Sequence, residues 1–319
     1  LIMEYRGVTY VDHYLDDFIT VGPRDTDVCN DNLAIMLDTC SDLGFAVNPC
    51  KVVPPTTQLE FLGITLDTVN MESRISDDRL DDVMSELNKW QSRKTCTKRE
   101  LLSLIGKLNF VSRVVKPGRT FVRRMIDFSK KIKHLHYKVK LNKQFQKDIQ
   151  WWLKYLPDWN GKCMIPSTCE DHHLYTDASD LGSGGYCEGE WFADAYTSDD
   201  VRKDKSINWR EMEAVAVAAA TWGHLWQGKR IIFHCDNDCI VQVVNSGTCR
   251  SPEILDLVRA LFSISARTVF SVHCEYINTK DNILADALSR MDFARFHREC
   301  LHASPHPVVP VPITEGMCL

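Results

Sequence analysis

Short apolar runs alternate with amphipathic helical stretches between about residues 170 and 290. Around 173–186 an apolar run leads to Asp177, small residues follow at once, and apolar positions then alternate up to Ala193. This pattern predicts a strand with a carboxylate at its end and a tight return into further antiparallel strands. We predict strands at 172–176, 184–188, 190–195, 231–235 and 270–276 and helices at 209–226, 239–245, 251–266 and 281–289. Three strands, a helix and then alternating strands and helices predict an α/β (α+β) domain with a mixed five-stranded sheet and flanking helices.

The stretch before this domain has a helical period instead. Apolar residues recur on one face of four predicted helices, at 77–90, 98–115, 121–128 and 142–156, the last ending at Pro157. Thr97 and Glu100 have the spacing of a capping box at the start of the second helix. We interpret the apolar stripes as core, and Trp151 and Trp152 as packing residues rather than as platforms for base stacking.

The N-terminal stretch begins with two predicted strands, 7–14 and 18–21, which are rich in Val, Thr, Tyr, Phe and Ile. Asp16 and Asp17 lie between them. A turn readily uses one Asp, but two adjacent carboxylates at a hairpin tip repel each other and suit a divalent metal ion. The residues alone leave both interpretations open. Further elements are predicted to follow: a helix at 25–43, a strand at 45–47 and a hairpin at 59–67.

Charge adds a feature that the hydrophobic pattern does not reveal. The 319 residues are 44% hydrophobic and 25% charged, as in globular proteins, and the net charge is −5. Between Lys89 and Lys147, however, eighteen Lys or Arg residues are opposed only by Glu100 and Asp127, so this stretch carries +16 and the remainder −21. One charged helix face is normally just solvated, but a segment this one-sided in an acidic chain indicates a polyanion such as nucleic acid.

Cysteine usage and hydropathy bear on the compartment. The thirteen cysteines are odd in number, and the nearest pairs, Cys163/Cys169 and Cys235/Cys239, lack the CxxC spacing of a zinc site. We therefore expect reduced thiols in an intracellular protein, cytoplasmic or nuclear. No signal peptide and no apolar run of transmembrane length is visible, so we expect no membrane partner. The chain begins with Leu1 and not Met, which favours a fragment that enters mid-domain.

Carboxylates mark four element ends of the predicted α/β domain: Asp177 after the first strand, Glu211 in the first turn of the long helix, Asp236 after the fourth strand and Asp286 in the last helix. Converging carboxylates can hold two hard divalent cations, one lowering the pKa of an attacking water and the other stabilising the leaving oxygen. Each carboxylate also has a simpler interpretation. Asp177 suits a turn; Glu211, three residues after Asn208, suits a helix cap, and so does Asp236. Asp286 lies among small apolar residues, where a charge is costly unless it is paired or metal-bound.

Two N-terminal motifs resemble reverse transcriptases. HYLDDF, residues 13–18, resembles the Tyr-x-Asp-Asp hairpin of that family, and LEFLGITLD, residues 59–67, is similar to its primer-grip hairpin. The resemblance implies that Asp16 binds metal for nucleotidyl transfer, with Asp17 beside it. The family's other metal-binding aspartate, its fingers and most of its nucleotide pocket lie upstream of the position of Leu1. Half of a two-metal site does not hold both cations in working geometry, so we expect an RNA-directed DNA polymerase remnant that does not polymerise DNA alone.

The four later carboxylates lie in motifs that resemble the Asp-Glu-Asp-Asp site of ribonuclease H. These motifs are YTDAS, WREMEAV, CDND and DNILADALSR, at 175–179, 209–215, 235–238 and 281–290. By this alignment Glu213 and Asp238 do not belong to the site, although they lie in the same motifs. The resemblance covers about residues 7–290, and within it the chain resembles DIRS-type or gypsy-type retrotransposon proteins. It implies hydrolysis of the RNA strand of RNA–DNA hybrids with two Mg²⁺ (or Mn²⁺) ions, leaving 3′-hydroxyl and 5′-phosphate ends.

One departure from the cellular enzymes concerns proton transfer. Many cellular ribonucleases H carry a His in the loop before the last Asp, whereas this loop, 278–280, has none. The resemblance therefore implies that water shuttles the proton and that turnover is slow. The competing hypothesis is a non-catalytic nucleic-acid-binding remnant of a decayed element.

The combined motifs predict four regions: a partial reverse-transcriptase palm at 1–76, a basic helical thumb and connection at 77–165, a ribonuclease H domain at 166–291 and a tail at 292–319. The tail contains four prolines and no periodicity after Ala303, so we expect it to be disordered. A thumb implies contact with the phosphates of a template–primer duplex, for which the candidates are Lys98, Arg99, Lys107 and Arg113. For the backbone or sugars of the hybrid the candidates are Ser183, Asn208 and Asn245.

Overall fold

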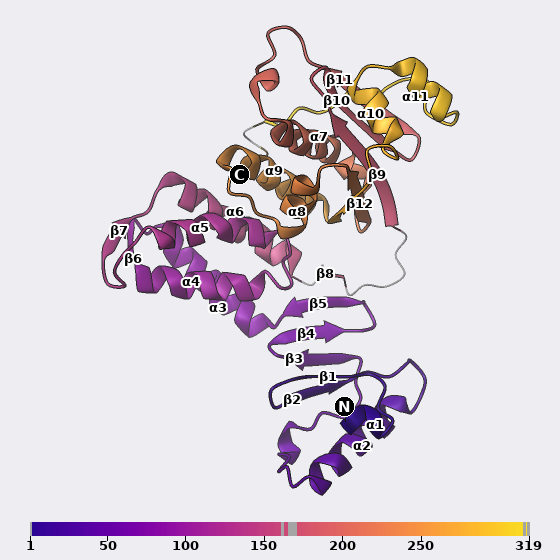
Figure 1. Cartoon of the computed structure of the whole chain (residues 1–319). Coiled ribbons are helices and arrows are strands. Elements are labelled where there is room, and N and C mark those ends of the chain that lie inside the picture. Colours follow the sequence, from indigo (N-terminus) through magenta and orange to yellow (C-terminus); the bar gives the residue numbers. More distant parts are fainter. Residues whose placement is uncertain (1, 161–162, 165–170, 315–316, 318–319) are drawn as a thin grey trace. The chain divides into compact units, whose positions relative to one another are not determined.

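The computed structural model describes residues 2–160, 163–164, 171–314 and 317. The chain forms two compact units, 1–76 and 77–319 (Figure 1). The expected helical region and the expected α/β domain both belong to the second unit, and the boundary expected between them, at 165/166, lies outside the described residues. None of the described helices has the length and apolar character that crossing a membrane requires.

The first unit contains two small antiparallel β structures and one long helix. Its elements are α1 (Ile2–Tyr5), β1 (Val11–Tyr14), β2 (Asp17–Thr20), α2 (Val28–Asp42), a 3₁₀ turn (Pro49–Lys51), β3 (Gln58–Phe61), β4 (Ile64–Asp67) and β5 (Glu72–Ile75). Strands β1 and β2 pair with Tyr14 opposite Asp17, so Leu15 and Asp16 form a two-residue turn. Leu15 has a φ of 55°, as the first position of such a turn requires. Strands β3, β4 and β5 form a meander.

The strand expected at 45–47 is not formed. The chain leaves α2 through Gly44, whose φ is 75°, and runs without regular structure to Pro49. Phe45 and Val47 are exposed. A β-prone sequence forms a strand only where a neighbouring strand accepts its hydrogen bonds, and this three-residue run has no such neighbour among the described residues.

The second unit begins with a helical part, which comprises α3 (Asp77–Gln91), β6 (Thr95–Thr97), α4 (Lys98–Val111), α5 (Gly118–Lys130), β7 (Lys138–Lys140) and α6 (Lys143–Trp159). The capping box is confirmed, because the Thr97 and Glu100 side chains each accept a hydrogen bond from the other residue's backbone N–H. The pairing of β6 with β7 was not predicted. The predicted end of α6 at Pro157 was wrong. A proline in the last turn removes only one backbone hydrogen bond, and the helix continues until Asn160 N–H bonds to Leu156 O at 3.0 Å.

The tryptophans of α6 are packing residues, as predicted. Trp151 and Trp152 are both buried. The ring of Trp151 stacks on Phe121 of α5 with centroids 3.9 Å apart. A side chain added at Gly118 would collide with the Trp152 ring, because a Cβ there would lie 2.1 Å from it. The start of α5 therefore approaches α6 closely only because residue 118 is a glycine.

The rest of the unit is the predicted mixed α/β fold. After a two-residue strand, β8 (Cys163–Met164), its elements are β9 (Asp171–Ala178), β10 (Gly182–Cys187), β11 (Glu190–Ala195), α7 (Ile207–Trp222), β12 (Arg230–Cys235), α8 (Asp238–Ser246), α9 (Pro252–Thr268), β13 (Ser271–Tyr276), α10 (Ile283–Ser289) and α11 (Phe293–Glu299), with 3₁₀ turns at Val201–Asp204 and Gly223–Leu225. The strand order is β11-β10-β9-β12-β13. Strands β9, β10 and β11 are antiparallel, whereas β9, β12 and β13 run parallel. The five-stranded mixed sheet with flanking helices confirms the predicted fold class.

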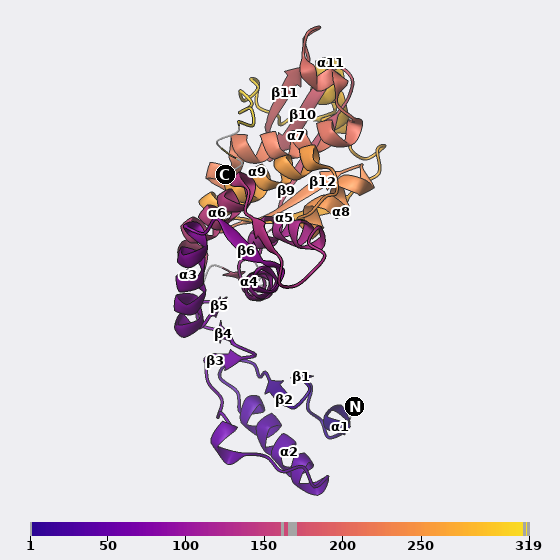
Figure 2. The same cartoon turned by 90° about the vertical axis from the view of Figure 1, so that its left-hand side faces the viewer.

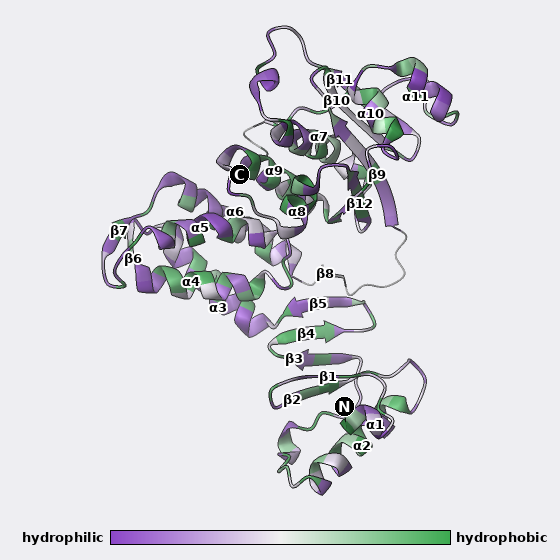
Figure 3. Ribbon diagram, in the orientation of Figure 1, coloured by the Kyte–Doolittle hydropathy of each residue, from purple (hydrophilic) through white to green (hydrophobic). Residues whose placement is uncertain are grey.

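Each face of this sheet has its own apolar cluster. Alternate residues such as Leu174, Phe192 and Phe233 pack with α7, α8 and α9, which carry many hydrophobic residues (Figure 3). Trp191, on the opposite face from Phe192, packs instead with Leu288 of α10 and Phe296 of α11. The period of two along the strands therefore produces two cores, and α10 is fixed on the face opposite α7.

The helical part and the α/β part are joined by a buried charge cluster. Helices α5 and α6 contact α9 (Figure 1 and Figure 2). The carboxylate of Asp148, on α6, accepts hydrogen bonds from Arg124 of α5 and Arg259 of α9. The side chains of Asp148 and Arg259 are at most 1% exposed.

The C-terminal residues differ from the expectation of disorder. Helix α11 occupies 293–299, and the following chain hydrogen-bonds along β11: Ser304 N–H to Gly189 O at 2.7 Å and Val308 N–H to Trp191 O at 2.8 Å. Ile313 packs on the larger core. Prolines prevent this stretch from forming regular secondary structure, but its backbone still finds partners at the exposed edge of the sheet.

Candidate active site

Helix α10 lies against the sheet where the strands carry glycine. A Cβ added at Gly184 would lie 2.5 Å from Leu288 Cβ and 2.8 Å from Ser289 N. The buried side chain of Asn282 donates to Thr176 O at 3.0 Å and ties the start of α10 to β9. The hydroxyl of Ser289, at the helix end, donates to the carboxylate of Asp177. Both ends of helix α10 are thus hydrogen-bonded to the central strand β9.

Glu211 projects from α7 and does not cap it. The helix begins at Ile207 with Ser206 as its N-cap, whose hydroxyl accepts from Trp209 N–H at 3.3 Å. Glu211 therefore lies at the start of the second turn, not in the first turn, and the capping interpretation was wrong. The sequence suggested Asn208 as the N-cap because serine and asparagine both favour the N-cap position. The thiol of Cys235 donates toward Glu211 Oε2 at 3.8 Å.

Asp236 is likewise not a helix cap. It directly follows β12, and the side chain of Asn237, not of Asp236, accepts from Cys239 N–H at 3.1 Å to cap α8. The amide of Asn237 also donates to Asn208 Oδ1 at 2.8 Å. This bond links the loop that carries Asp236 to the start of α7, so the two backbones are held together.

The four predicted carboxylates influence one another electrostatically. Burial raises the pKa of Glu211 to about 9, with further contributions from the charges of Asp177 and Asp236. Burial also raises the pKa of Asp177 to about 6; the Ser289 hydrogen bond opposes this rise, and the charges of Asp236 and Asp286 add to it. Like charges that raise one another's pKa in a buried site favour a bound cation.

The chemistry of the donors fits a hard divalent cation. Ligand atoms of Glu211, Cys235 and Asp236 lie within 4.8 Å of one another, the single such group of three among the described residues. Burial raises the pKa of the Cys235 thiol well above its usual range, so this sulfur is protonated and does not act as a thiolate ligand. Carboxylate oxygens remain as donors, and these suit Mg²⁺ or Mn²⁺.

Asp286 has a different environment from the other three carboxylates. Its Oδ1 accepts from Arg290 Nε and its Oδ2 from Arg295 Nη1, both at 2.6 Å. Burial acts to raise the pKa of Asp286, but these two arginines outweigh it and lower the pKa. We expected the charge of Asp286 to be costly unless it is paired or metal-bound. In the structure it is paired, because an arginine donates to each of its oxygens.

Glu213 and Asp238, which the alignment excluded from the site, bond to residues outside the group of four carboxylates. Glu213, two residues after Glu211, accepts from Arg202 Nη1 at 3.3 Å, and burial raises its pKa to about 7. Asp238 is exposed and accepts from Gln242 Nε2 at 3.0 Å. Both have structural partners that account for their positions.

The remaining candidates in the α/β part are largely engaged in the fold. Ser183 is fully buried between strands, so its side chain is not available to a ligand, and its selection as a contact residue was wrong. The amide of Asn245 bonds twice to the backbone of Cys274, at 2.7 and 2.9 Å. Asn208 is partly buried and accepts from Asn237. The sequence did not reveal these roles because each partner is distant along the chain.

The basic candidates divide into two pairs. Lys98 Nζ donates to Ile132 O at 2.7 Å, and Lys107 forms a 2.9 Å ion pair with Asp82. Arg99 and Arg113 are exposed. Only the second pair therefore presents guanidinium groups that are open to a ligand.

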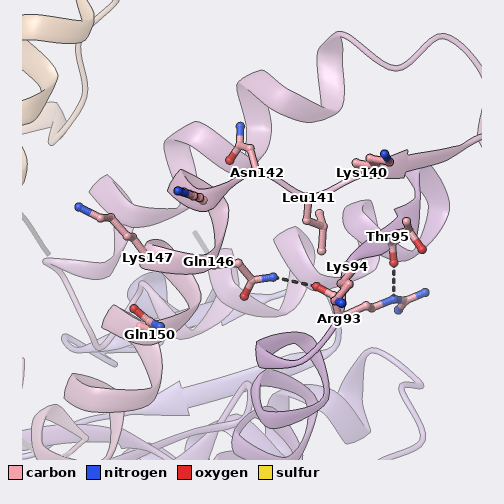
Figure 4. Close-up of a pocket in the computed structure, with 10 residues that line it drawn as sticks. Arg93, Lys94, Thr95, Lys140, Leu141, Asn142, Gln146, Lys147 and Gln150 are labelled. Atoms are coloured by element: carbon pink, nitrogen blue, oxygen red, sulfur yellow. Dashed lines mark hydrogen bonds between the residues drawn. The ribbon is translucent and has the colours of Figure 1, made fainter.

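A basic pocket in the helical part was missed by the sequence analysis. It has a volume of about 720 Å³ and is lined by five cationic side chains and no acidic one (Figure 4). The lining residues are Arg93, Lys94, Thr95, Lys140, Leu141, Asn142, Lys143, Gln146, Lys147 and Gln150. The count of positive charges indicated a polyanion, but the concave arrangement depends on the β6–β7 pairing, which the sequence did not predict.

Asp16 and Asp17 lie together at the exposed tip of the β1–β2 hairpin. Among the described residues, no third His, Cys, Asp or Glu completes a metal-binding group with them. The predicted hairpin is formed, but β1 begins only at Val11, and Asp17 lies in β2 and not between the strands. Its role in metal binding remains a prediction from the resemblance alone.

Comparisons with known proteins find only distant structural similarity. No family model and no curated protein matches the chain. A foamy viral protease-reverse transcriptase in complex with double-stranded DNA is 12% identical, over 85% of this chain and 46% of that chain, with a TM-score of 0.41. The same kind of protein in complex with an RNA/DNA hybrid is 12% identical over 83% and 35%, with a TM-score of 0.37. RNase H1 from the halophilic archaeon Halobacterium salinarum NRC-1 is 16% identical over 39% of this chain and 99% of that chain, with a TM-score of 0.29. The chain thus spans about half or less of the viral proteins that it matches in these two complexes.

Proposed function

We propose that the chain is part of a retroelement reverse transcriptase–ribonuclease H protein, of DIRS or gypsy type, and that it hydrolyses the RNA strand of RNA–DNA hybrids. One observation carries this proposal. Four carboxylates from separate parts of the fold lie close together: the charges of Asp236 and Asp286 raise the pKa of Asp177, and those of Asp177 and Asp236 raise the pKa of Glu211. Among the described residues neither Glu211 nor Asp177 forms an ion pair, so a structural role of that kind does not explain these two buried carboxyl groups.

Four carboxylates, Asp177, Glu211, Asp236 and Asp286, would hold the divalent ions. Bound Mg²⁺ or Mn²⁺ would lower the pKa of an attacking water and stabilise the leaving oxygen. The protein's own groups orient these ligands: Ser289 donates to Asp177, and the Asn237–Asn208 bond fixes the loop of Asp236. The buried thiol of Cys235 donates toward Glu211 Oε2. The loop at 278–280 offers no His, so protons would leave through water.

The basic pocket supports binding of a nucleic-acid duplex. Its cations are clustered and unopposed by acid within the lining, as a phosphate backbone requires. Such contacts would position a hybrid or a template–primer duplex without reading its sequence. Arg99 and Arg113, which are exposed on and after α4, are further candidates for the same role.

Cleavage of a labelled RNA–DNA hybrid tests the proposal. In Mg²⁺ we expect the RNA strand to be cut, and we expect Asp236→Asn to lower the rate by more than about 100-fold because it removes a metal-binding charge. Asp238→Asn is the matched control, since it removes a carboxylate two residues away that bonds only to Gln242. Equal cleavage by Asp236→Asn and the wild type would refute the assignment.

A second candidate function is binding of hybrids without cleavage. The observation in its favour is that both oxygens of Asp286 already accept from arginines. A chain that binds the hybrid in a salt-dependent manner, but leaves the RNA intact in Mg²⁺ and in Mn²⁺, would support this candidate over the nuclease.

A further inference from the structure

The carboxylate of Asp286 is fully engaged by cationic side chains. Arg290 Nε and Arg295 Nη1 each lie 2.6 Å from a different oxygen of this carboxylate. The Asp286 side chain is 12% exposed, so little solvent competes with these bonds. Charge-assisted hydrogen bonds of this length are among the stronger polar contacts in proteins. A cation that approached Asp286 would therefore compete with these two guanidinium groups for its oxygens.

The two arginines are held to different degrees. Arg290 lies one helical turn after Asp286 on α10, and its side chain is 58% exposed. Arg295 comes from α11, and its side chain is 33% exposed. Its backbone N–H is bonded to the capping side chain of Asp292 at 3.0 Å, and its neighbour Phe296 is fully buried against the sheet. The guanidinium of Arg295 is therefore placed by the packing of α11, whereas that of Arg290 has more freedom to turn to solvent.

We infer that Arg295 is a positioning residue that competes with the divalent cation for Asp286, so that helix α11 lowers the metal affinity of the site. The inference rests on the proposed function in one respect, namely that Asp286 belongs to the metal-binding carboxylates. In the metal-free protein the Arg295 guanidinium pairs with Asp286 Oδ2 at 2.6 Å. When a cation takes that place, the guanidinium must leave the carboxylate.

Direct measurement of metal binding tests this role without relying on catalysis. In calorimetric titration of the full chain with Mn²⁺, we expect Arg295→Gln to bind the ion about three- to tenfold more tightly than the wild type. Arg295→Lys keeps the charge and should restore the weaker affinity. Arg298→Gln is the matched control on the same helix, because Arg298 is 69% exposed and pairs with Glu299, so its removal should leave the affinity unchanged.

A double-mutant comparison separates competition at Asp286 from a general change in charge. In an Asp286→Asn background, Arg295→Gln should no longer alter Mn²⁺ affinity. Unchanged or weaker binding by Arg295→Gln, or tighter binding that persists in the Asp286→Asn background, would overturn the inference. If Arg295→Gln does not fold, Arg295→Met, which keeps the aliphatic stem, takes its place under the same criteria.

The outcome is distinguishable from that of the proposed function. The predicted Mn²⁺ affinities without any cleavage of the hybrid would overturn the nuclease and sustain the role of Arg295. Cleavage of the hybrid with no effect of Arg295→Gln on Mn²⁺ binding would sustain the nuclease and overturn the role of Arg295. The absence of Mn²⁺ binding in every variant would overturn the inference.

Discussion

The buried cluster of Asp148, Arg124 and Arg259 should contribute strongly to the stability of the second unit. Asp148 is fully buried and accepts from Arg124 at 2.8 and 3.2 Å, as well as from Arg259. Burial lowers the pKa of Arg259, and the charge of Asp148 opposes that shift. Asp148→Asn keeps the shape of the side chain but removes the carboxylate charge that accepts from the buried Arg259 guanidinium. Removing one partner of such a pair costs about 3–5 kcal/mol.

Urea unfolding, monitored by tryptophan fluorescence, measures this loss of stability in the second unit. All eight tryptophans of the chain lie after residue 76, so their emission reports only the second unit. We expect the free energy of unfolding of Asp148→Asn to fall by about 3–5 kcal/mol, a large share of the roughly 5–15 kcal/mol that is typical of a domain. Asp127→Asn is the control, because Asp127 is 40% exposed and its pairs with Arg123 and Lys130 lie at the surface. It should cost less than about 1 kcal/mol.

Removing both buried charges gives the sharper test. In Asp148→Leu with Arg259→Met, neither charge is left without a partner, and Arg124, which is 21% exposed, can turn to water. We therefore expect the double variant to be at least about 2 kcal/mol more stable than the sum of the two single losses predicts. A loss below about 1 kcal/mol for Asp148→Asn, or additive losses in the double variant, would refute this account of the cluster.

Two further predictions concern the site and the basic pocket. Glu211 has a pKa of about 9 in the metal-free protein against an ordinary value of 4.5, so its contribution to stability is complete below pH 4.5 and is lost as the pH rises toward 9. Urea unfolding in chelator should show this loss, Glu211→Gln should flatten it, and an unchanged pH profile in that variant would contradict the assignment. Lys143→Gln with Lys147→Gln should weaken binding of an RNA–DNA hybrid and reduce the slope of log affinity against log salt by about one per lysine. Lys154→Gln, on the same helix but outside the pocket lining, should leave the slope unchanged, and an equal effect of Lys154→Gln would show that the pocket is not the contact.

Much of the α/β part follows from its sequence because burial on both faces forces the strand pattern. The edge strand β11 was predicted to the residue, and β12 to within one, since successive residues such as Trp191 and Phe192 pack into different cores. Helix starts were less accurate. The start of α7 was missed by two residues because Ser206 and Asn208 are both good caps, and only the packing of the helix decides between them.

The helical part was harder to predict because its decisive contacts are short or distant. The exposed Lys138–Lys140 strand is three residues long, too short for alternation to be recognised, yet its pairing with Thr95–Thr97 creates the basic pocket. Asp148 and Arg259 are 111 residues apart. No local pattern distinguishes such an aspartate from a solvated one, so the cluster is visible only once α6 and α9 are packed together.

The four carboxylates of the site were all identified from local motifs, but the way in which their charges are balanced was not. Glu211, with its pKa near 9, is neutralised by a proton at neutral pH, whereas Asp286 is neutralised by two arginines and has a lowered pKa. One of those arginines, Arg295, lies in a tail that its composition made us expect to be disordered. The distinction has a chemical consequence, because a cation that enters the site must release a proton from Glu211 and displace a guanidinium from Asp286. Metal affinity should therefore depend on pH, because Glu211 of α7 must lose its proton. It should also depend on the packing of α11, because Arg295 of that helix pairs with Asp286 of α10. Neither dependence can be read from a single sequence motif.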